Sequence, residues 1–296
     1  MEFFSPLKGK FRFFYLGFFI KDYLVDKLKL WRPERSWEES EQAWDASAVA
    51  AAQERPIKEL RQLPQMPGMT PETAKGLKWK SLKYMIQHDT DGSVRRGFFL
   101  HPFKHAWAYL KSCFSSSSYV RDGDLFLYGL PNEAAFKQRL KDQEAIFVLG
   151  FSYCQKPFEC PSGRFTSDCV HDATHPVCRQ CFIGKCVHAT PEKRSEILFI
   201  PTVHYIGAKI FEIQKKYPGR PIVFLITACE LTLEMFADWG NMVGIKGIGV
   251  RLDGRICNTM KAFELSERGV KPGLTVVLQE TQKRMLEFIR LRRVQP

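Results

Sequence analysis

The amino-acid sequence predicts an α/β fold in which helices cover both faces of a mostly parallel sheet. Three apolar runs, 145–151, 221–228 and 245–252, are typical of strands that are buried on both faces. Segments of helical character alternate with these runs, and the clearest of them, 203–217, repeats its apolar residues every three or four positions. Strands of this kind avoid water only when helices pack on each side of the sheet, so the alternation favours a layered α/β domain.

The first thirty residues stand apart, because seven of the chain's 24 Phe fall within the first twenty positions. The apolar run at 13–20 is too short to span a bilayer, which needs about 20 helical residues. A helix here would carry charged residues such as Lys8 and Arg12 on one side and aromatic residues on the other. Residues 1–30 are therefore predicted to form an aromatic amphipathic helix. Two interpretations remain open, which are binding to an anionic membrane surface and packing on the protein or a second copy.

Residues 31–78 are predicted to form an acidic helix and a proline-rich linker. Four acidic residues at 38–45 lead into an alanine-rich stretch at 46–52, which has high helix propensity. Regular structure is then interrupted by Pro56, Pro64, Pro67 and Pro71.

Residues 79–296 are predicted to form the α/β domain, with a cysteine-rich insertion at 152–190. Its first part, 79–105, is basic and mixes apolar with polar residues, and a turn is expected at Asp91-Gly92. Further elements are expected in this order: a strand at 125–128, a helix at 131–141, a short apolar segment at 197–201, and helices at 230–239, 260–267 and 278–289.

Six of the nine cysteines lie within 33 residues. They are Cys154, Cys160, Cys169, Cys178, Cys181 and Cys186. A hydrophobic core does not require thiols at this density, whereas a metal centre does. The N-terminal apolar run lacks the small-residue cleavage site of a secretory signal, and the cysteine total is odd, which disfavours a disulfide framework. The sequence therefore predicts a cytoplasmic protein with metal-binding or redox-active thiols.

Three thiols follow the three predicted buried strands. Cys154 lies just beyond the first strand, Cys229 directly follows the second, and Cys257 follows the third after a turn. Because parallel strands end at the same edge of a sheet, these thiols are expected to meet there, with the cysteine-rich loop folded over them. The alternative is that Cys229 and Cys257 are ordinary buried thiols.

The sequence Cys178-x-x-Cys181 is a chelating pair, and Cys186 follows it beyond Gly184. Three thiolates at this spacing suit an iron–sulfur cluster completed by another Cys, and they equally suit zinc with Cys or His as the fourth ligand. The favoured cofactor is one or two [4Fe–4S] clusters, with zinc as the alternative. The predicted metal ligands are Cys178, Cys181, Cys186, Cys154, Cys160, Cys169, Cys229 and Cys257.

A redox-active dithiol is a third interpretation of Cys178 and Cys181. Such a dithiol needs its first Cys at a helix N-terminus after a strand, whereas residues 173–177 have the character of a loop. The histidines of the segment are candidate ligands or hydrogen-bond donors to the ligands, but each taken singly is better explained as a loop residue: His171, His175 and His188.

Several motifs, in a fixed order along the chain, are shared with a known family. The motifs are Cys160-Pro161, the run from Cys178 to Cys186, Ala228-Cys229-Glu230, and Gly249-Val-Arg-Leu with Cys257-Asn-Thr. With these motifs, residues 145–269 resemble the bacterial and archaeal family called domain of unknown function 116. The resemblance implies an α/β cysteine-rich domain whose activity is not established. The four residues between Cys181 and Cys186 are a wider spacing than the family implies.

The leading functional expectation is a cytoplasmic iron–sulfur protein with a redox or electron-transfer role. It would serve an unidentified redox partner protein, and residues 1–30 would either attach it to the inner face of the membrane or pack on the protein. The chain has no phosphate-binding loop and no nucleophile elbow, so the sequence predicts no particular substrate or reaction.

The alternative is a zinc-stabilised, non-enzymatic binding module that contacts nucleic acid or a partner at the membrane surface. The formal net charge of +12 favours anionic partners of either kind. The aromatic fraction of 13% fits nucleic acid as well, although the sequence carries no recognisable nucleic-acid motif.

Overall fold

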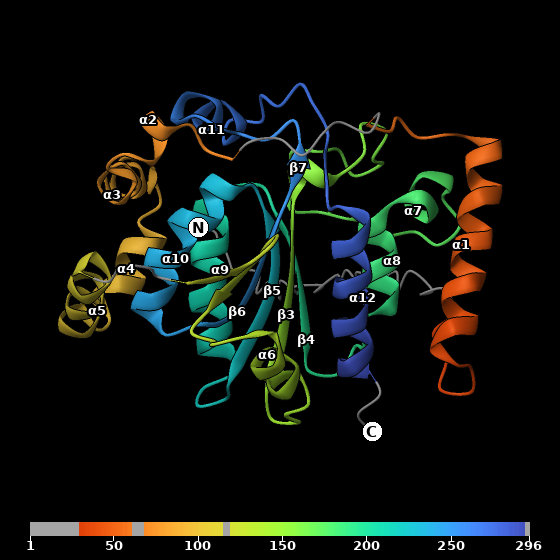
Figure 1. The fold of residues 1–296 in the computed structure, drawn as a ribbon, viewed down its shortest axis with the longest axis horizontal. Helices are drawn as coiled ribbons and strands as arrows, with labels where there is room; N and C mark the ends of the chain where they lie inside the picture. The colour runs from red at the N-terminus through yellow and green to blue at the C-terminus, as the bar shows by residue number, and fades with distance from the viewer. Residues whose placement is uncertain (1–29, 61–67, 115–118, 294–296) are drawn as a thin grey trace, which may run out of the picture.

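The computed structural model describes residues 30–60, 68–114 and 119–293, and these residues form an α/β fold around one six-stranded sheet (Figure 1). The spatial order of the strands is β1-β2-β6-β5-β3-β4. Their bounds are β1 Val120–Asp122, β2 Leu125–Tyr128, β3 Ile146–Ser152, β4 Ser195–Ile200, β5 Ile222–Ala228 and β6 Lys246–Arg251. Strands β4, β3, β5 and β6 are parallel, and the antiparallel β2 and β1 extend one edge. The predicted mostly parallel sheet is confirmed.

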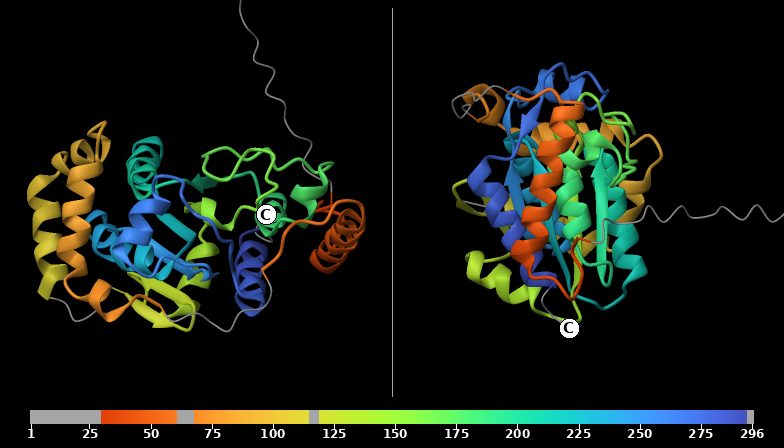
Figure 2. Two further views of the ribbon diagram at one scale, coloured as in Figure 1. Left: turned by 90° about the horizontal axis from the view of Figure 1, so that it is seen from above. Right: turned by 90° about the vertical axis from the view of Figure 1, so that its right-hand side faces the viewer.

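Side chains alternate between the two faces of each central strand, as a period of two requires. In β3, Phe147, Leu149 and Phe151 pack on one face, whereas Ile146 and Val148 pack on the other. The first face is covered by α6 Glu133–Leu140, α8 Phe182–Ala189 and α12 Gln279–Arg293, and the second by α9 Val203–Lys216 and α10 Glu230–Val243. The views in Figures 1 and 2 show the sheet between these two helical layers, as the sequence predicts.

The order of the parallel strands creates a crevice at their carboxyl ends. The chain passes from β3 to β4 on one side of β3, and it then returns to place β5 on the other side. The crossover direction therefore reverses between β3 and β5, which is where open α/β sheets bind their ligands. A small antiparallel pair, β7 Asp253–Gly254 and β8 Thr275–Val276, lies just beyond the end of β6.

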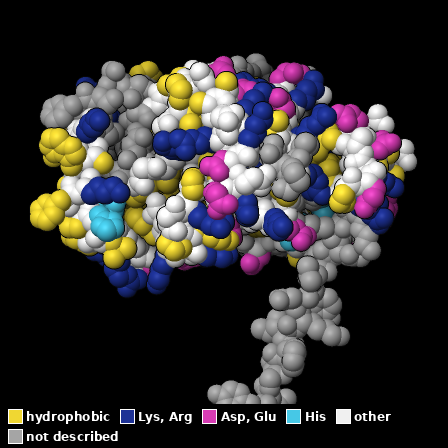
Figure 3. All heavy atoms as spheres, turned by 90° about the horizontal axis from the view of Figure 1, so that it is seen from below, with side chains coloured by type: hydrophobic (Ala, Val, Ile, Leu, Met, Phe, Trp, Pro, Cys, Tyr) yellow, Lys and Arg dark blue, Asp and Glu magenta, His cyan; other side chains and the backbone are white. Residues whose placement is uncertain are grey.

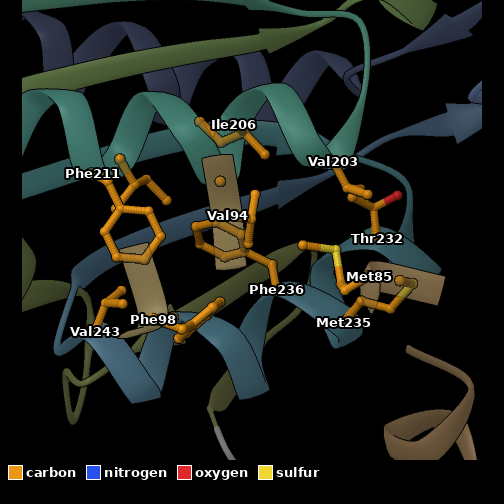
Figure 4. Close-up of a pocket in the computed structure, with 13 residues that line it drawn as sticks. Met85, Val94, Phe98, Val203, Ile206, Phe211, Thr232, Met235, Phe236 and Val243 are labelled. Carbon is orange, nitrogen blue, oxygen red and sulfur yellow. The ribbon is translucent and has the colours of Figure 1, made fainter. Parts of the chain in front are cut away.

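Residues 71–114 form helices that the sequence did not reveal as separate elements. They are α2 Pro71–Ala74, α3 Leu77–His88, α4 Ser93–Phe99 and α5 Pro102–Phe114. Helices α3 and α5 pack on α10, and α4 packs on α9, so they form an outer layer on one face of the sheet. A pocket with an almost wholly hydrophobic lining lies beneath them, where Val94, Phe98 and Phe236 converge (Figure 4).

The predicted acidic helix is α1 Trp37–Glu54, and it packs against the cysteine-rich segment. A capping box at its start, in which Ser36 and Glu39 each bond the other's backbone N–H, fixes where the helix begins. The ammonium group of Lys185 in α8 lies 2.9 Å from the Glu41 carboxylate and 2.8 Å from that of Asp45. Helix α1 is therefore part of the support of the cysteine-rich segment.

The predicted amphipathic helix at 1–30 falls almost entirely outside the described residues. Within the ranges that the structure describes, no helix combines the length and the apolar character needed to cross a membrane. Helix α11 Met260–Ser266 completes the elements, and it lies near the end of β6.

We expect Trp44→Ala to destabilise the protein by about 3–5 kcal/mol, because Trp44 is buried between Trp31 and His188. Chemical denaturation followed by circular dichroism measures the free energy of unfolding. Val49 is exposed on the same helix, and Val49→Ala should change this energy by less than about 0.5 kcal/mol. Equal effects of the two substitutions would show that α1 does not pack on the core.

Candidate functional site

The cysteine-rich segment leaves the sheet at the end of β3 and returns through two short helices. A 3-10 turn, Tyr153–Gln155, leads into a loop that ends at α7 Pro176–Gln180. Pro176 begins α7, and the His175 ring accepts a hydrogen bond from the Val177 N–H, so both residues define the helix start. Cys178 therefore lies within α7, and Cys181 lies at the junction where α8 begins.

Four thiols of this segment line one small cavity. They are Cys160, Cys169, Cys178 and Cys181, and the cavity is also lined by Lys156 and His171. Burial raises the pKa of both Cys178 and Cys181 to about 12, and the nearby Cys160 and Cys169 thiols contribute by charge repulsion. Four of the eight predicted ligands are thus brought together.

Backbone N–H groups lie near three of these four sulfurs. Those of Gly184 and Ile183, in the first turn of α8, lower the pKa of Cys181 and so oppose the effect of burial. The Asp172 N–H lowers the pKa of Cys178 in the same way, and the His171 N–H lowers that of Cys169. Each of these N–H groups favours the thiolate form over the thiol, as does the N-terminus of a helix.

Lys156 is buried beside the same cavity and ties the loop together. Its side chain is only 1% exposed. The ammonium group donates to the carbonyl oxygens of Asp168 at 2.6 Å, Thr166 at 3.0 Å and Gly163 at 3.3 Å, and to the Thr166 hydroxyl at 2.9 Å. Burial lowers the pKa of Lys156, and the Cys160 and Cys169 thiols oppose that shift.

Arg164 connects this loop to the segment that follows α11. Its guanidinium donates to the carbonyl oxygens of Lys156 at 3.1 Å and Cys154 at 3.0 Å, and to those of Lys271 and Gly273, both at 3.0 Å. Sequence reasoning missed Lys156 and Arg164. Their position could have identified them, because both are basic residues inside a cysteine-rich segment.

A second cavity lies at the crevice between the ends of β3 and β5. Cys154, Cys229 and Cys257 line it together with Glu267. These are the three thiols that the sequence places after the three buried strands, and the structure brings them to one edge of the sheet. Burial raises the pKa of Glu267 to about 8, although its carboxylate accepts a hydrogen bond from the Val203 N–H at 2.9 Å.

Cys229 and Cys257 form a hydrogen-bonded thiol pair in this second cavity. That hydrogen bond is the main reason why the pKa of Cys257 is lowered and that of Cys229 is raised. The Lys271 ammonium lies 3.0 Å from the Cys257 sulfur and favours its thiolate. Cys257 is thus the thiol that ionises first in the pair. Sequence reasoning also missed Lys271, for which no spacing pattern gave a signal.

Cys186 lies apart from both groups of thiols. It is fully buried in the core that α8 forms with the sheet, and neither cavity reaches it. His171 lies in the loop and His175 caps α7, but the prediction of a loop position is wrong for His188, which lies within α8 and whose ring bonds the His171 carbonyl at 2.8 Å. The eight cysteines whose side chains the structure describes are free thiols. The side chain of Cys113 lies outside the described part.

Over the described residues, no group of three His, Cys, Asp or Glu side chains has the geometry that would hold a single metal ion. A tetrahedral zinc site places its sulfurs about 2.3 Å from one ion, so the sulfurs must lie within about 4 Å of each other. The four thiols that share the loop cavity are not gathered in that way.

Comparison with known proteins gives no relative for this chain. No family model matches it, no curated protein matches it, and no solved structure matches it. The resemblance to the domain of unknown function 116 therefore stays a prediction.

We expect Gly184→Ala to disturb the four-thiol cavity, because a Cβ atom at this position would lie 2.3 Å from the Cys178 carbonyl oxygen. The clash involves backbone, so α7 and α8 must move apart, at a cost of about 1–3 kcal/mol. Gly207→Ala is the matched helical control, since the nearest atoms to its Cβ would all be side-chain carbons, a Val94 methyl group at 3.2 Å being the closest. Thermal unfolding compares the variants, and equal stability would contradict the close approach.

Proposed function

We propose that this protein binds a [4Fe–4S] cluster through Cys160, Cys169, Cys178 and Cys181 and has a redox or electron-transfer role. The observation that carries the proposal is that these four thiols line a single cavity. Clusters of this type are held by four Cys thiolates. When bound, such a cluster supplies one-electron transfer.

The donor set fits a cluster better than it fits a single zinc ion. Each thiolate of a [4Fe–4S] site binds a different iron, so the sulfurs surround the cluster and need not converge on one point. Four thiols around one cavity, without a compact group of three, agree with that requirement in the described residues. A zinc ion bound by the same four thiols would require their sulfurs to move together around one point.

The surroundings of the four thiols also fit a negatively charged group. The start of α8, with its backbone N–H groups, lies at Cys181 and favours negative charge on that sulfur, and N–H groups near sulfur are one of the ways in which proteins tune iron–sulfur centres. The ammonium of Lys156 lies buried at the cavity, where a cation is costly unless negative charge is near. An anionic cluster would supply that charge.

Cys154, Cys229 and Cys257 stay predicted ligands of a second centre. The Arg164 guanidinium, bonded to the carbonyls of both Lys156 and Cys154, joins the two thiol sites through one side chain. A second centre at the crevice would therefore be connected to the first one through Arg164.

Purification without oxygen, followed by iron and sulfide analysis and a visible spectrum, tests the proposal. We expect the wild-type protein to be brown with iron and sulfide bound, and Cys178→Ser to lose most of that iron. Cys186→Ala should keep it, because Cys186 lies in the core away from the cavity. A colourless protein with stoichiometric zinc would contradict the proposal, as would equal iron loss in both variants.

We further expect Lys156→Met to lower the reduction potential by about 60 mV or more, which corresponds to about a tenfold change for one electron. Reduction adds negative charge, and the buried ammonium at the cavity stabilises that charge. Lys156→Arg should recover much of the loss, and Lys193→Met, at an exposed position, is the neutral control. A redox titration followed by electron paramagnetic resonance measures the potential. A potential that does not change in Lys156→Met would show that the lysine only holds the loop.

A further inference from the structure

The outer layer formed by α3, α4 and α5 exposes an unusual number of large hydrophobic side chains. Each is more than half exposed: Trp79 67%, Ile86 55%, Phe99 75%, Leu100 71%, Phe103 90%, Trp107 72% and Leu110 51%. We call these seven residues the outer apolar face. Single exposed hydrophobic residues are ordinary, but seven large ones on three adjacent helices indicate an interaction surface.

Helix α5 shows most directly that this exposure is organised. Phe103, Trp107 and Leu110 follow each other at intervals of four and three residues, so they lie along one side of the helix. That side faces solvent, whereas His105 of the same helix is buried and bonds the Phe98 carbonyl at 2.8 Å. The apolar side of an amphipathic helix normally faces the core, so in α5 the usual orientation is reversed.

The outer apolar face is set in positive charge. Residues 71–111 contain eight Lys or Arg and three Asp or Glu, a net charge of +5. Lys104 and Lys111 are exposed on α5 beside the apolar stripe, and Arg95 and Arg96 are exposed on α4. In the view from below, hydrophobic side chains gather among Lys, Arg and His at the end where these helices lie (Figure 3).

We infer that the outer apolar face binds the surface of an anionic lipid bilayer. Exposed Trp, Phe and Leu side chains suit the boundary between headgroups and acyl chains, and Lys and Arg beside them suit anionic headgroups. Both features occur together on α5, in Trp107 and Lys104. This surface differs from residues 1–30, on which the sequence-based membrane prediction rests, and it does not depend on the iron–sulfur proposal.

Charge and side-chain type argue against other occupants of this face. A second copy of the face would carry the same positive charge, and residues 1–29 carry six Lys or Arg against three Asp or Glu, so neither is complementary. Single-stranded nucleic acid would use aromatic stacking, but Ile86, Leu100 and Leu110 have no ring to stack on a base. A bilayer accommodates both the aliphatic and the aromatic side chains.

The position of this face leaves the thiol sites accessible to a redox partner. Helices α3 to α5 lie at one end of the long axis of the molecule, and α1 and α7 lie at the other (Figures 1 and 2). A protein bound to a bilayer through α5 would therefore hold the cysteine-rich segment away from the lipid.

Co-sedimentation of the full-length protein with vesicles tests the inference. The vesicles contain equal parts of phosphatidylcholine and phosphatidylglycerol, with phosphatidylcholine alone for comparison. We expect the protein to bind the mixed vesicles and to bind them more weakly at high salt. The affinity of the triple variant F103A/W107A/L110A should be lower by about tenfold or more. The control V49A/V270A removes exposed apolar residues elsewhere and should bind as the wild type does.

Three results would overturn the inference. The first is unchanged binding by the triple variant, which would assign any binding to residues outside the outer apolar face. The second is equal binding to neutral and anionic vesicles. The third is an absence of binding to the mixed vesicles, in which case sedimentation velocity and binding to single-stranded RNA would show whether a second copy or a nucleic acid occupies the face instead. Circular dichroism of the triple variant confirms the fold, since Ala keeps helix propensity at exposed positions.

Discussion

The buried ammonium of Lys156 organises the cysteine-rich segment. Four hydrogen bonds from its Nζ atom draw together parts of a loop that has no regular structure between residues 156 and 175. Taking an ammonium out of water is costly, and neutral oxygens repay only part of that cost. The thiols at the same cavity can become thiolates, and thiolates bound to metal would balance the charge. With the proposed cluster bound, loop geometry and cluster charge would be linked through this one side chain.

The topology of the sheet determines where the thiols can meet. Strands β3 and β5 are neighbours, and the chain leaves them towards opposite faces, so their carboxyl ends open onto a shared crevice. Cys154 and Cys229 follow these two strands and reach the crevice directly. The loop cavity lies further along the same segment, where Arg164 anchors it. The loop cavity thus gathers thiols from one short segment, whereas the crevice gathers thiols that are distant in the sequence.

The central strands could be predicted because each is a short apolar run in the sequence. The convergence of Cys154, Cys229 and Cys257 could be predicted because each thiol follows such a run and parallel strands end at the same edge. The sequence could not separate Cys186 from the other thiols of its segment. Whether a thiol on α8 faces the core or the loop depends on how that helix packs, and here α8 turns Cys186 inward. The outer helices were missed for another reason. Helices α2 and α4 have only 4 and 7 residues, which is too short to show a period, although Phe103, Trp107 and Leu110 do recur at helical spacing in α5.

Iron K-edge X-ray absorption of the anaerobically purified full-length protein addresses the bound group without any substitution. A cluster held by thiolates predicts a first coordination shell made of sulfur, together with a second peak from iron–iron scattering. Iron surrounded by oxygen or nitrogen with no iron neighbour would contradict the account. So would a protein that contains zinc in place of iron.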